Sequence, residues 1–465
     1  MTRIDGVELI IMIVATFAQA LSGSAPSVTI IGVLIVWRFL LGIGVGGDYP
    51  QSAVITSEFA STNIRGRMMN AVFACQGWGN LTAALVGLIV LSAYKSSIVN
   101  DAPTQSGNWN AVDPCWRLLI GLGCIPGVVA LYFRLTIPET PRFTMDIERN
   151  IQQATKDIEI MLTTDYSRDL DATLALRAEA PRASWRDFKN HFSKWENFKV
   201  LFGYAYSWFA LDIAFYGLGL NTSAILQAIG FESNDRIGSL NGQRVYDTLR
   251  KICAGHLILS AAGLIPGYWV CFFFIDSWGR RPIQLMGFTI LTILFVIMGF
   301  AFDALEKFND QGQVVSTSAG FFVLYCLANF FQNFGPNTTT FIVPGEAFPT
   351  RYRSTAHGIS AGSGKLGAIV TQVTFNKLKD IHGKNKFIKH MCGFPLTLIP
   401  HVDERHRPTR FTIFAFFMLT GVFSTLLIPE TKGKSLEELS NEDQEGFYRA
   451  PKRPVVRRDL QTSDK

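Results

Sequence analysis

The chain has 465 residues, of which 48% are hydrophobic and 17% charged, with a mean hydropathy of +0.21 and a net charge of +6. A soluble protein usually carries about 25% charged residues, so this composition argues against a set of ordinary soluble domains. Apolar runs of about 18 or more residues instead predict an all-α polytopic membrane protein.

The apolar runs predict ten membrane-spanning helices. They lie near residues 6–24, 28–50, 69–93, 116–137, 198–220, 253–275, 283–302, 318–344, 355–377 and 410–428. The first run begins almost at the first residue but has no cleavage site, so we interpret it as a span and not as a signal peptide.

A charged stretch without long apolar runs divides these spans into two groups. We expect an N-terminal transmembrane bundle at 1–137, a cytoplasmic linker at 138–197, a C-terminal bundle at 198–430 and a cytoplasmic tail at 431–465. Pairs of arginines or lysines occupy alternate short loops, and such loops face the cytoplasm. Both termini and the linker are therefore predicted to be cytoplasmic.

A weak internal repeat relates the two groups. EFASTNIRGR at 58–67 and IPETPR at 137–142 have counterparts in GEAFPTRYRS at 345–354 and IPETKG at 428–433. Two similar halves joined by a linker are typical of transporters whose halves rock against each other.

One acidic residue, Asp212, lies in the middle of the apolar run VLFGYAYSWFALDIAFYGLGL. A carboxylate at membrane depth costs about 2.5–3.5 kcal/mol on insertion scales, so it rarely faces lipid. The helical period places Trp208, Asp212 and Tyr216 on one face, which predicts the wall of a polar cavity. The alternatives are an aspartate that caps a helix break or pairs with Lys365.

Two further charges lie within predicted spans. Lys365, in SAGSGKLGAIV, needs a partner, which an incoming anion, Asp48 or Asp212 would supply; alternatively its side chain extends to the interface. Asp48 follows GVGG and is predicted to relay protons, with a structural ion pair to Arg38 as the alternative.

Several motifs together resemble the major facilitator superfamily, in its sugar-porter-like branch. They are RFLLGIGVGGDYP, DSWGRRP, VPGEAFPTRYR and the two PET motifs. Four stretches are similar to fungal and plant high-affinity phosphate:proton symporters: GGDYPQSAVITSEFA (46–60), YGLGLNTSAIL (216–226), FGPNTTTFIVPGEAFPTRYRSTAHGISAGSGKLGAI (334–369) and LIPETKGKSLEE (427–438).

This resemblance implies the major facilitator fold and a phosphate site at mid-membrane between its halves. The matching ligand positions are Tyr49, Gln76, Trp208, Asp212, Tyr216 and Asn337. The tyrosines, the tryptophan and the amides offer neutral donors, and a protonated Asp212 can donate to phosphate while its carboxylate can accept from a phosphate hydroxyl. The resemblance also assigns proton coupling to Asp48 and anion attraction and coupling to Lys365.

Charged residues at the cytoplasmic helix ends form a separate set. We expect them to make salt bridges that hold one conformation, as a latch, rather than to touch substrate. They are Glu58, Arg65, Asp276, Arg280, Arg281, Glu346, Arg351 and Arg353.

The chain departs from the family pattern in two places. It begins where the third of the usual twelve helices is expected, so the first two helices are predicted to be missing. Residues 392–410, CGFPLTLIPHVDERHRPTR, form a polar insert in what is otherwise a short external loop. A gene-model error would explain either feature, and a bundle without two helices raises the alternative of a non-functional product.

We predict proton-coupled phosphate import at a plasma membrane by alternating access. The alternatives are a carrier of sugar or another organic solute, and a receptor that senses phosphate. The seven cysteines show no CxxC spacing, and no nucleotide-binding loop, metal cluster or nucleophile triad is evident. The sequence therefore predicts no enzyme activity, no cofactor, no metal and no nucleic-acid partner; the expected partners are phosphate, protons and the lipid bilayer.

Overall fold

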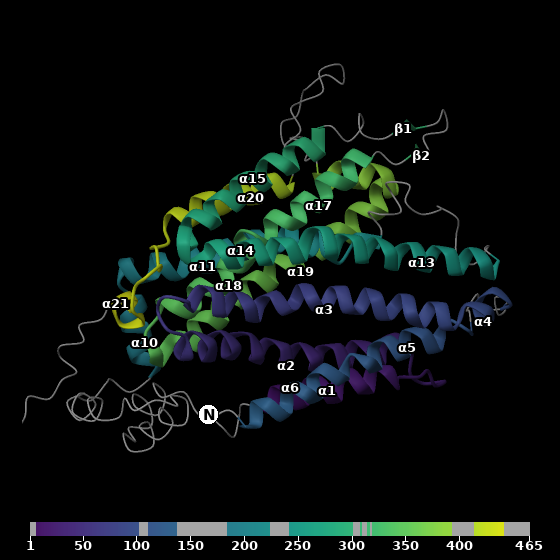
Figure 1. The fold of residues 1–465 in the computed structure, drawn as a ribbon, viewed down its shortest axis with the longest axis horizontal. Coiled ribbons are helices and arrows are strands. Elements are labelled where there is room, and N and C mark those ends of the chain that lie inside the picture. Colours follow the sequence, from purple (N-terminus) through teal and green to yellow (C-terminus); the bar gives the residue numbers. More distant parts are fainter. Residues whose placement is uncertain are drawn as a thin grey trace, which may run out of the picture.

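The computed structural model describes residues 6–101, 110–136, 184–223, 241–300, 307–308, 314–316, 319–392 and 413–440. Long helices lying side by side dominate this part of the chain (Figure 1). The first group comprises α1 (Val7–Ala20), α2 (Ile30–Phe59), α3 (Arg65–Ala93), α4 (Lys95–Val99), α5 (Asp113–Leu122) and α6 (Cys124–Thr136).

The second group begins within the predicted linker, at Trp185. It comprises α10 (Trp185–Phe192), α11 (Trp195–Gly219), α13 (Gly242–Leu259), η2 (Ser260–Leu264), α14 (Ile265–Trp278), α15 (Arg280–Phe300), α17 (Ala319–Asn333), α18 (Pro336–Ala347), α19 (Thr350–Cys392), α20 (Ile413–Leu426) and α21 (Leu436–Leu439). In the described residues the only sheet is an antiparallel pair of β1 (Lys307–Phe308) and β2 (Val314–Ser316).

Each of the ten expected spans falls on one of these helices or on consecutive ones, and the span near 253–275 covers α13, η2 and α14. Among the described residues, five helical segments are long and apolar enough to cross a membrane: Ile30–Phe59, Arg65–Ala93, Asp113–Thr136, Gly242–Trp278 and Arg280–Gly299. Shorter apolar helices are Val7–Ala20 and Ile413–Leu426. The fold class is therefore the predicted one.

Prolines divide two of the expected spans. The span near 116–137 breaks at Gly123 into α5 and α6, because Pro126 has no N–H to donate to the carbonyl of Leu122. The span near 318–344 breaks at Gly335, directly before Pro336, into α17 and α18. The sequence-based prediction treated each as one helix, so it was wrong about these breaks.

The two largest of the four apolar cores among the described residues lie in different parts of the molecule. One joins α11, α15, α17 and α20. The other contains residues of α2, α3, α14 and α18, so it lies where the first group of helices (purple and blue in Figure 1) meets the second. The outer face of α2 carries exposed apolar side chains, such as Ile31 and Phe39, as expected for a helix facing lipid.

The proposed bundle boundaries remain a prediction, and most of the predicted linker and insert lies outside the described residues. Residues 431–440, the start of the predicted tail, pack against the helices, with Thr431 and Leu436 buried.

Candidate functional site

Glycines allow α11 and α19 to approach closely around Asp212. A Cβ atom on Gly364 would lie 2.5 Å from Cδ1 of Trp208 and 2.7 Å from Oδ2 of Asp212. A Cβ atom on Gly367 would lie 2.5 Å from the carbonyl oxygen of Phe209. The small residues of the GSGKLGA stretch therefore bring the backbone of α19 next to the acidic face of α11.

This approach places Lys365 against the acidic face of α11. Its Nζ donates to Oδ2 of Asp212 at 3.2 Å and to the hydroxyl of Tyr216 at 2.7 Å. The Asp212 side chain is 2% exposed, whereas the Lys365 side chain is 41% exposed. Of the partners considered for Lys365, the structure therefore places Asp212 beside it, and part of the Lys365 side chain stays exposed.

Aromatic rings surround this ion pair. Nζ of Lys365 lies 5.3 Å from the ring centroid of Tyr49 and 4.4 Å from that of Tyr216. The rings of Tyr49 and Trp208 are 6.5 Å apart, with Trp208 buried against the edge of His357. Cation–π attraction and a hydroxyl acceptor therefore hold Lys365 between α2 and α11.

The two predicted amide ligands lie on either side of Tyr268, a residue that the sequence analysis missed. The Tyr268 hydroxyl donates to Oε1 of Gln76 at 2.6 Å and accepts from Nδ2 of Asn337 at 2.8 Å. Tyr268 lies in the apolar stretch GYWVCFFF, where nothing in the sequence distinguishes it from a packing residue.

Phe73 and Phe341 connect the amide group to the ion pair. The ring of Phe73 lies 5.9 Å from Tyr268, 6.4 Å from Tyr49 and 4.4 Å from Phe341, and Phe341 lies 6.3 Å from Tyr49. The predicted ligands Tyr49, Gln76, Trp208, Asp212, Tyr216 and Asn337 thus belong to one neighbourhood between the two groups of helices.

Asp48 has a different partner from the one considered in the sequence analysis. Its Oδ1 pairs with Nη2 of Arg134 at 2.8 Å and accepts from Ser52 at 3.1 Å, so Arg38 as a partner was wrong. Glu8 approaches the same guanidinium at 4.0 Å. Arg134 lies within a predicted span, and its charge there was the signal that could have identified it.

Two of the predicted latch contacts join helices from different halves of the chain. Glu58 of α2 and Arg353 of α19 pair at 2.6 Å, and each side chain is 1% exposed. Asp276 of α14 accepts the backbone N–H groups of Gly66 and Arg67 at 3.1 and 3.0 Å. A carboxylate is favourable there because the N–H groups at the start of α3 have no partner within the helix.

Other members of the predicted set cluster around Arg280. Its guanidinium pairs with Glu346 at 2.8 Å and with Asp276 at 2.9 Å. The backbone N–H groups of Arg280 and Arg281 both donate to Glu430 of the second PET motif, at 3.0 Å. Glu430 therefore caps α15, a role that the sequence analysis did not assign.

The remaining two arginines contact segments outside the helix bundles. Arg65 donates to the carbonyl oxygen of Lys434 at 3.1 Å. Arg351 pairs with Asp187 of α10 at 2.9 Å, and the Tyr352 hydroxyl also donates to Asp187. Burial raises the pKa of Asp187, but the hydrogen bonds from Tyr352 and Arg351 outweigh this and hold it below its usual value.

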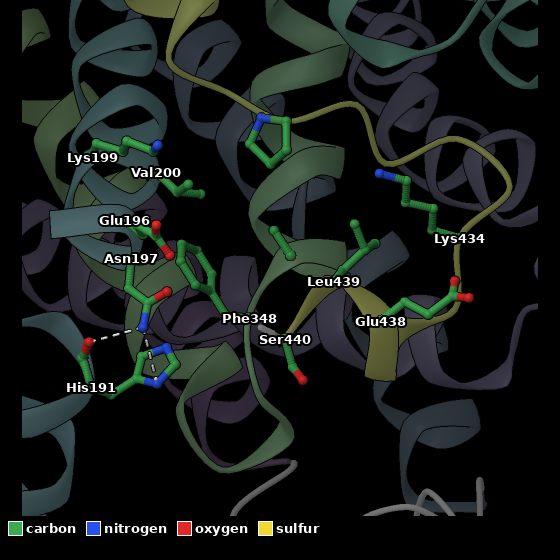
Figure 2. Close-up of a pocket in the computed structure, with 12 residues that line it drawn as sticks. His191, Glu196, Asn197, Lys199, Val200, Phe348, Lys434, Glu438, Leu439 and Ser440 are labelled. Carbon is green, nitrogen blue, oxygen red and sulfur yellow. Dashed lines mark hydrogen bonds between the residues drawn. The ribbon is translucent and has the colours of Figure 1, made fainter. Parts of the chain in front are cut away.

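A pocket of about 270 Å³ lies apart from the predicted ligands, beside α10, the start of α11 and residues 429–440 (Figure 2). His191 and Asn197 are hydrogen-bonded on one side of it, and Lys434 and Glu438 lie on the other. Its mixed charges give no preference for one ligand. Within the described ranges, no group of three or more His, Cys, Asp or Glu side chains is placed to hold a metal ion.

Comparison with known proteins identifies related sequences. The chain matches the model of a family described as sugar (and other) transporter over residues 7–226 and 256–442. A repressible high-affinity phosphate permease of Neurospora crassa is 48% identical over 449 residues, which cover 94% of this chain and 73% of that protein. The inorganic phosphate transporter PHO84 of Saccharomyces cerevisiae is 47% identical over 459 residues, covering 94% and 72%.

Solved structures resemble the fold. The proton:xylose symporter XylE, of the major facilitator superfamily, bound to 6-bromo-6-deoxy-D-glucose, superposes with a TM-score of 0.63 at 19% identity. The match covers 94% of this chain and 82% of that structure. At this identity the likeness shows the fold alone.

Proposed function

The chain belongs to the sugar (and other) transporter family of the major facilitator superfamily, alongside fungal and plant inorganic phosphate transporters, and we propose that it imports phosphate together with protons. Membership of this family makes it a multi-pass membrane transport protein, and we propose that it is not an enzyme. The observation that carries the specific proposal is the Lys365–Asp212 pair, flanked by hydroxyl and amide donors.

The charges of this pair support an anion as substrate and a proton as co-substrate. The ion pair of Lys365 and Asp212 is neutral as a unit, so a phosphate monoanion added beside it introduces one negative charge. A proton on Asp212 restores neutrality and frees the ammonium group for the anion. A neutral site is favourable because an uncompensated charge in a low-dielectric interior costs several kcal/mol.

The contacts between the halves support alternating access. In the described conformation, the Glu58–Arg353 pair and the contacts of Asp276 with Gly66 and Arg67 connect α2 and α3 to α19 and α14. Opening of the site toward the cytoplasm would have to separate them, so we propose that they act as a latch. We also propose that Asp48 relays protons through its contact with Arg134, that both termini are cytoplasmic, and that the membrane is the plasma membrane.

Uptake of labelled phosphate by cells or reconstituted vesicles tests this function. We expect uptake to rise as the external pH falls and to be lost with a proton ionophore. Asp212→Asn should abolish it, because an amide cannot exchange a proton, whereas the control Asp113→Asn alters an acid that is 51% exposed and should leave uptake intact.

Competition experiments separate phosphate from the organic-solute alternative. Arsenate should compete with labelled phosphate and glucose should not. Uptake that ignores the ionophore would contradict proton coupling, and competition by glucose but not arsenate would point to a carrier of organic solutes. Phosphate binding without uptake would indicate a receptor.

A further inference from the structure

A line of hydrogen bonds runs from α17 through α18 and α14 to α3. Nδ2 of Asn333 donates to the backbone carbonyl of Asn329 at 2.7 Å. Oδ1 of Asn333 accepts from Nδ2 of Asn337 at 2.7 Å, and the same Nδ2 donates to the hydroxyl of Tyr268 at 2.8 Å. The Tyr268 hydroxyl donates to Oε1 of Gln76 at 2.6 Å.

The backbone carbonyl at one end fixes the direction of the three bonds that the asparagines make. A carbonyl can only accept, so Asn333 must present its NH₂ group to Asn329 and its oxygen to Asn337. Asn337 must then donate, and both of its amide hydrogens are used. The single phenolic hydrogen of Tyr268 then needs an acceptor, and Gln76 is the other side chain that its hydroxyl contacts among the described residues, so Gln76 presents Oε1 to it.

Burial prevents the line from reversing. Tyr268 and Asn333 are 0% exposed and Asn337 is 3% exposed, so water is not available to replace a partner. The Tyr268 ring is also held in place, because a Cβ atom on Gly77 would lie 3.1 Å from its Cδ2. An unpaired polar group here would carry the full penalty of its desolvation.

We propose that Tyr268, held by the three asparagines, is a positioning residue that makes the NH₂ group of Gln76 the donor to the transported anion. This inference rests on the proposed function. With Oε1 bonded to Tyr268, Gln76 retains Nε2 as its free polar group within the described residues, and its side chain is partly exposed. A side-chain amide that would otherwise present either atom is thereby fixed as a donor.

The same polarity gives Asn337 the opposite role. Since both of its hydrogens are used, only its Oδ1 remains for a ligand, and oxygen can only accept. A donor from Gln76 and an acceptor from Asn337 match an oxyanion that carries a hydroxyl group, such as monoanionic phosphate or arsenate. Sulfate has no hydroxyl at neutral pH and cannot satisfy Asn337.

The test combines Tyr268→Phe and Gln76→Ala in a double-mutant cycle of phosphate uptake. We expect Tyr268→Phe to raise KM about tenfold and to change kcat less than about twofold, because the lost interaction is one that orients a ligand for the anion. When Tyr268→Phe is added to the Gln76→Ala variant, the KM should stay at the value of Gln76→Ala alone.

Tyr325→Phe is the matched control. Tyr325 is also buried, and its hydroxyl contacts Thr222 and the carbonyl of Leu218 instead of the predicted ligands. We expect its KM to stay at the wild-type value. Multiplicative effects of Tyr268→Phe and Gln76→Ala on KM, or a loss confined to kcat, would overturn the proposal.

A second readout separates this inference from the proposed function. The second readout is the melting temperature, without phosphate, of wild type, Tyr268→Phe, Gln76→Ala and the double variant. The loss in the double variant should differ from the sum of the two single losses by about 1–3 °C. Additive melting temperatures refute the hydrogen-bonded line whatever the protein transports. If the melting temperatures are coupled but the protein takes up no phosphate, the phosphate function and the anion-positioning role are refuted. The hydrogen-bonded line itself would then stand.

Discussion

Neutralising Glu58 measures how strongly the two halves are held together. The Glu58–Arg353 pair is 2.6 Å long with both side chains 1% exposed. Two unit charges at this distance attract by about 6 kcal/mol at an effective dielectric constant of ~20, before the desolvation of both groups is subtracted. Breaking a buried pair costs about 3–5 kcal/mol, because the remaining charge stays buried without compensation. Glu58→Gln should therefore lower the melting temperature by about 5–10 °C.

Thermal unfolding of the purified protein in detergent is the assay. Arg353→Gln should cause a comparable loss, and the double variant should lose much less than the sum, because neither charge is then left alone. Asp113→Asn serves as the control: its partner Arg117 is one helical turn away on an exposed surface, where such a pair contributes about 0–1 kcal/mol. Additive losses, or a loss at Glu58 no larger than at Asp113, would refute the reasoning.

Three further predictions address the site and its surroundings. Gly364→Ala should raise KM for phosphate at least about tenfold, since its Cβ would lie 2.7 Å from Oδ2 of Asp212, whereas Gly362→Ala, with open space around it, should leave uptake unchanged. Asp276→Asn should lower the melting temperature by about 2–4 °C, because α3 loses a charged cap contributed by the other half, and an unchanged value would contradict that role. The pKa of the Asp187 carboxyl is lower in the folded protein than in the unfolded chain. Its contacts with Arg351 and Tyr352 therefore stabilise the fold fully above the unfolded pKa, and this stability is lost as the pH falls through the lowered folded pKa. The difference in melting temperature between wild type and Asp187→Asn should therefore shrink as the pH falls from about 5 toward about 3, and a difference that stays the same over this range would count against the prediction.

Much of the site could be predicted because its residues follow a helical period or match a motif. Trp208, Asp212 and Tyr216 share a face by spacing alone, and the structure places Lys365 against two of them. The partner of Asp48 could not be predicted in this way. Arg38 is close in sequence on the same helix, but Arg134, which is distant in sequence, lies on a neighbouring helix in the folded chain.

Helix breaks were partly predictable. Pro126 and Pro336 each lack the N–H that would continue the helix, so their positions should have indicated the division of two spans. Pro50, however, lies inside α2 without ending it. The difference depends on neighbouring helices, which a local pattern does not report.

The sequence by itself determined the class of the molecule: its apolar runs require helices, because a backbone in lipid must bond within its own segment, and its motifs identify the family. The tertiary structure decided which charges meet and in which direction buried amides point. Gln76, Tyr268 and Asn337 come from three helices, and no local rule relates them. Their hydrogen bonds acquire one direction because packing excludes water, places a backbone carbonyl at one end of the line and leaves the phenolic hydrogen of Tyr268 in need of an acceptor.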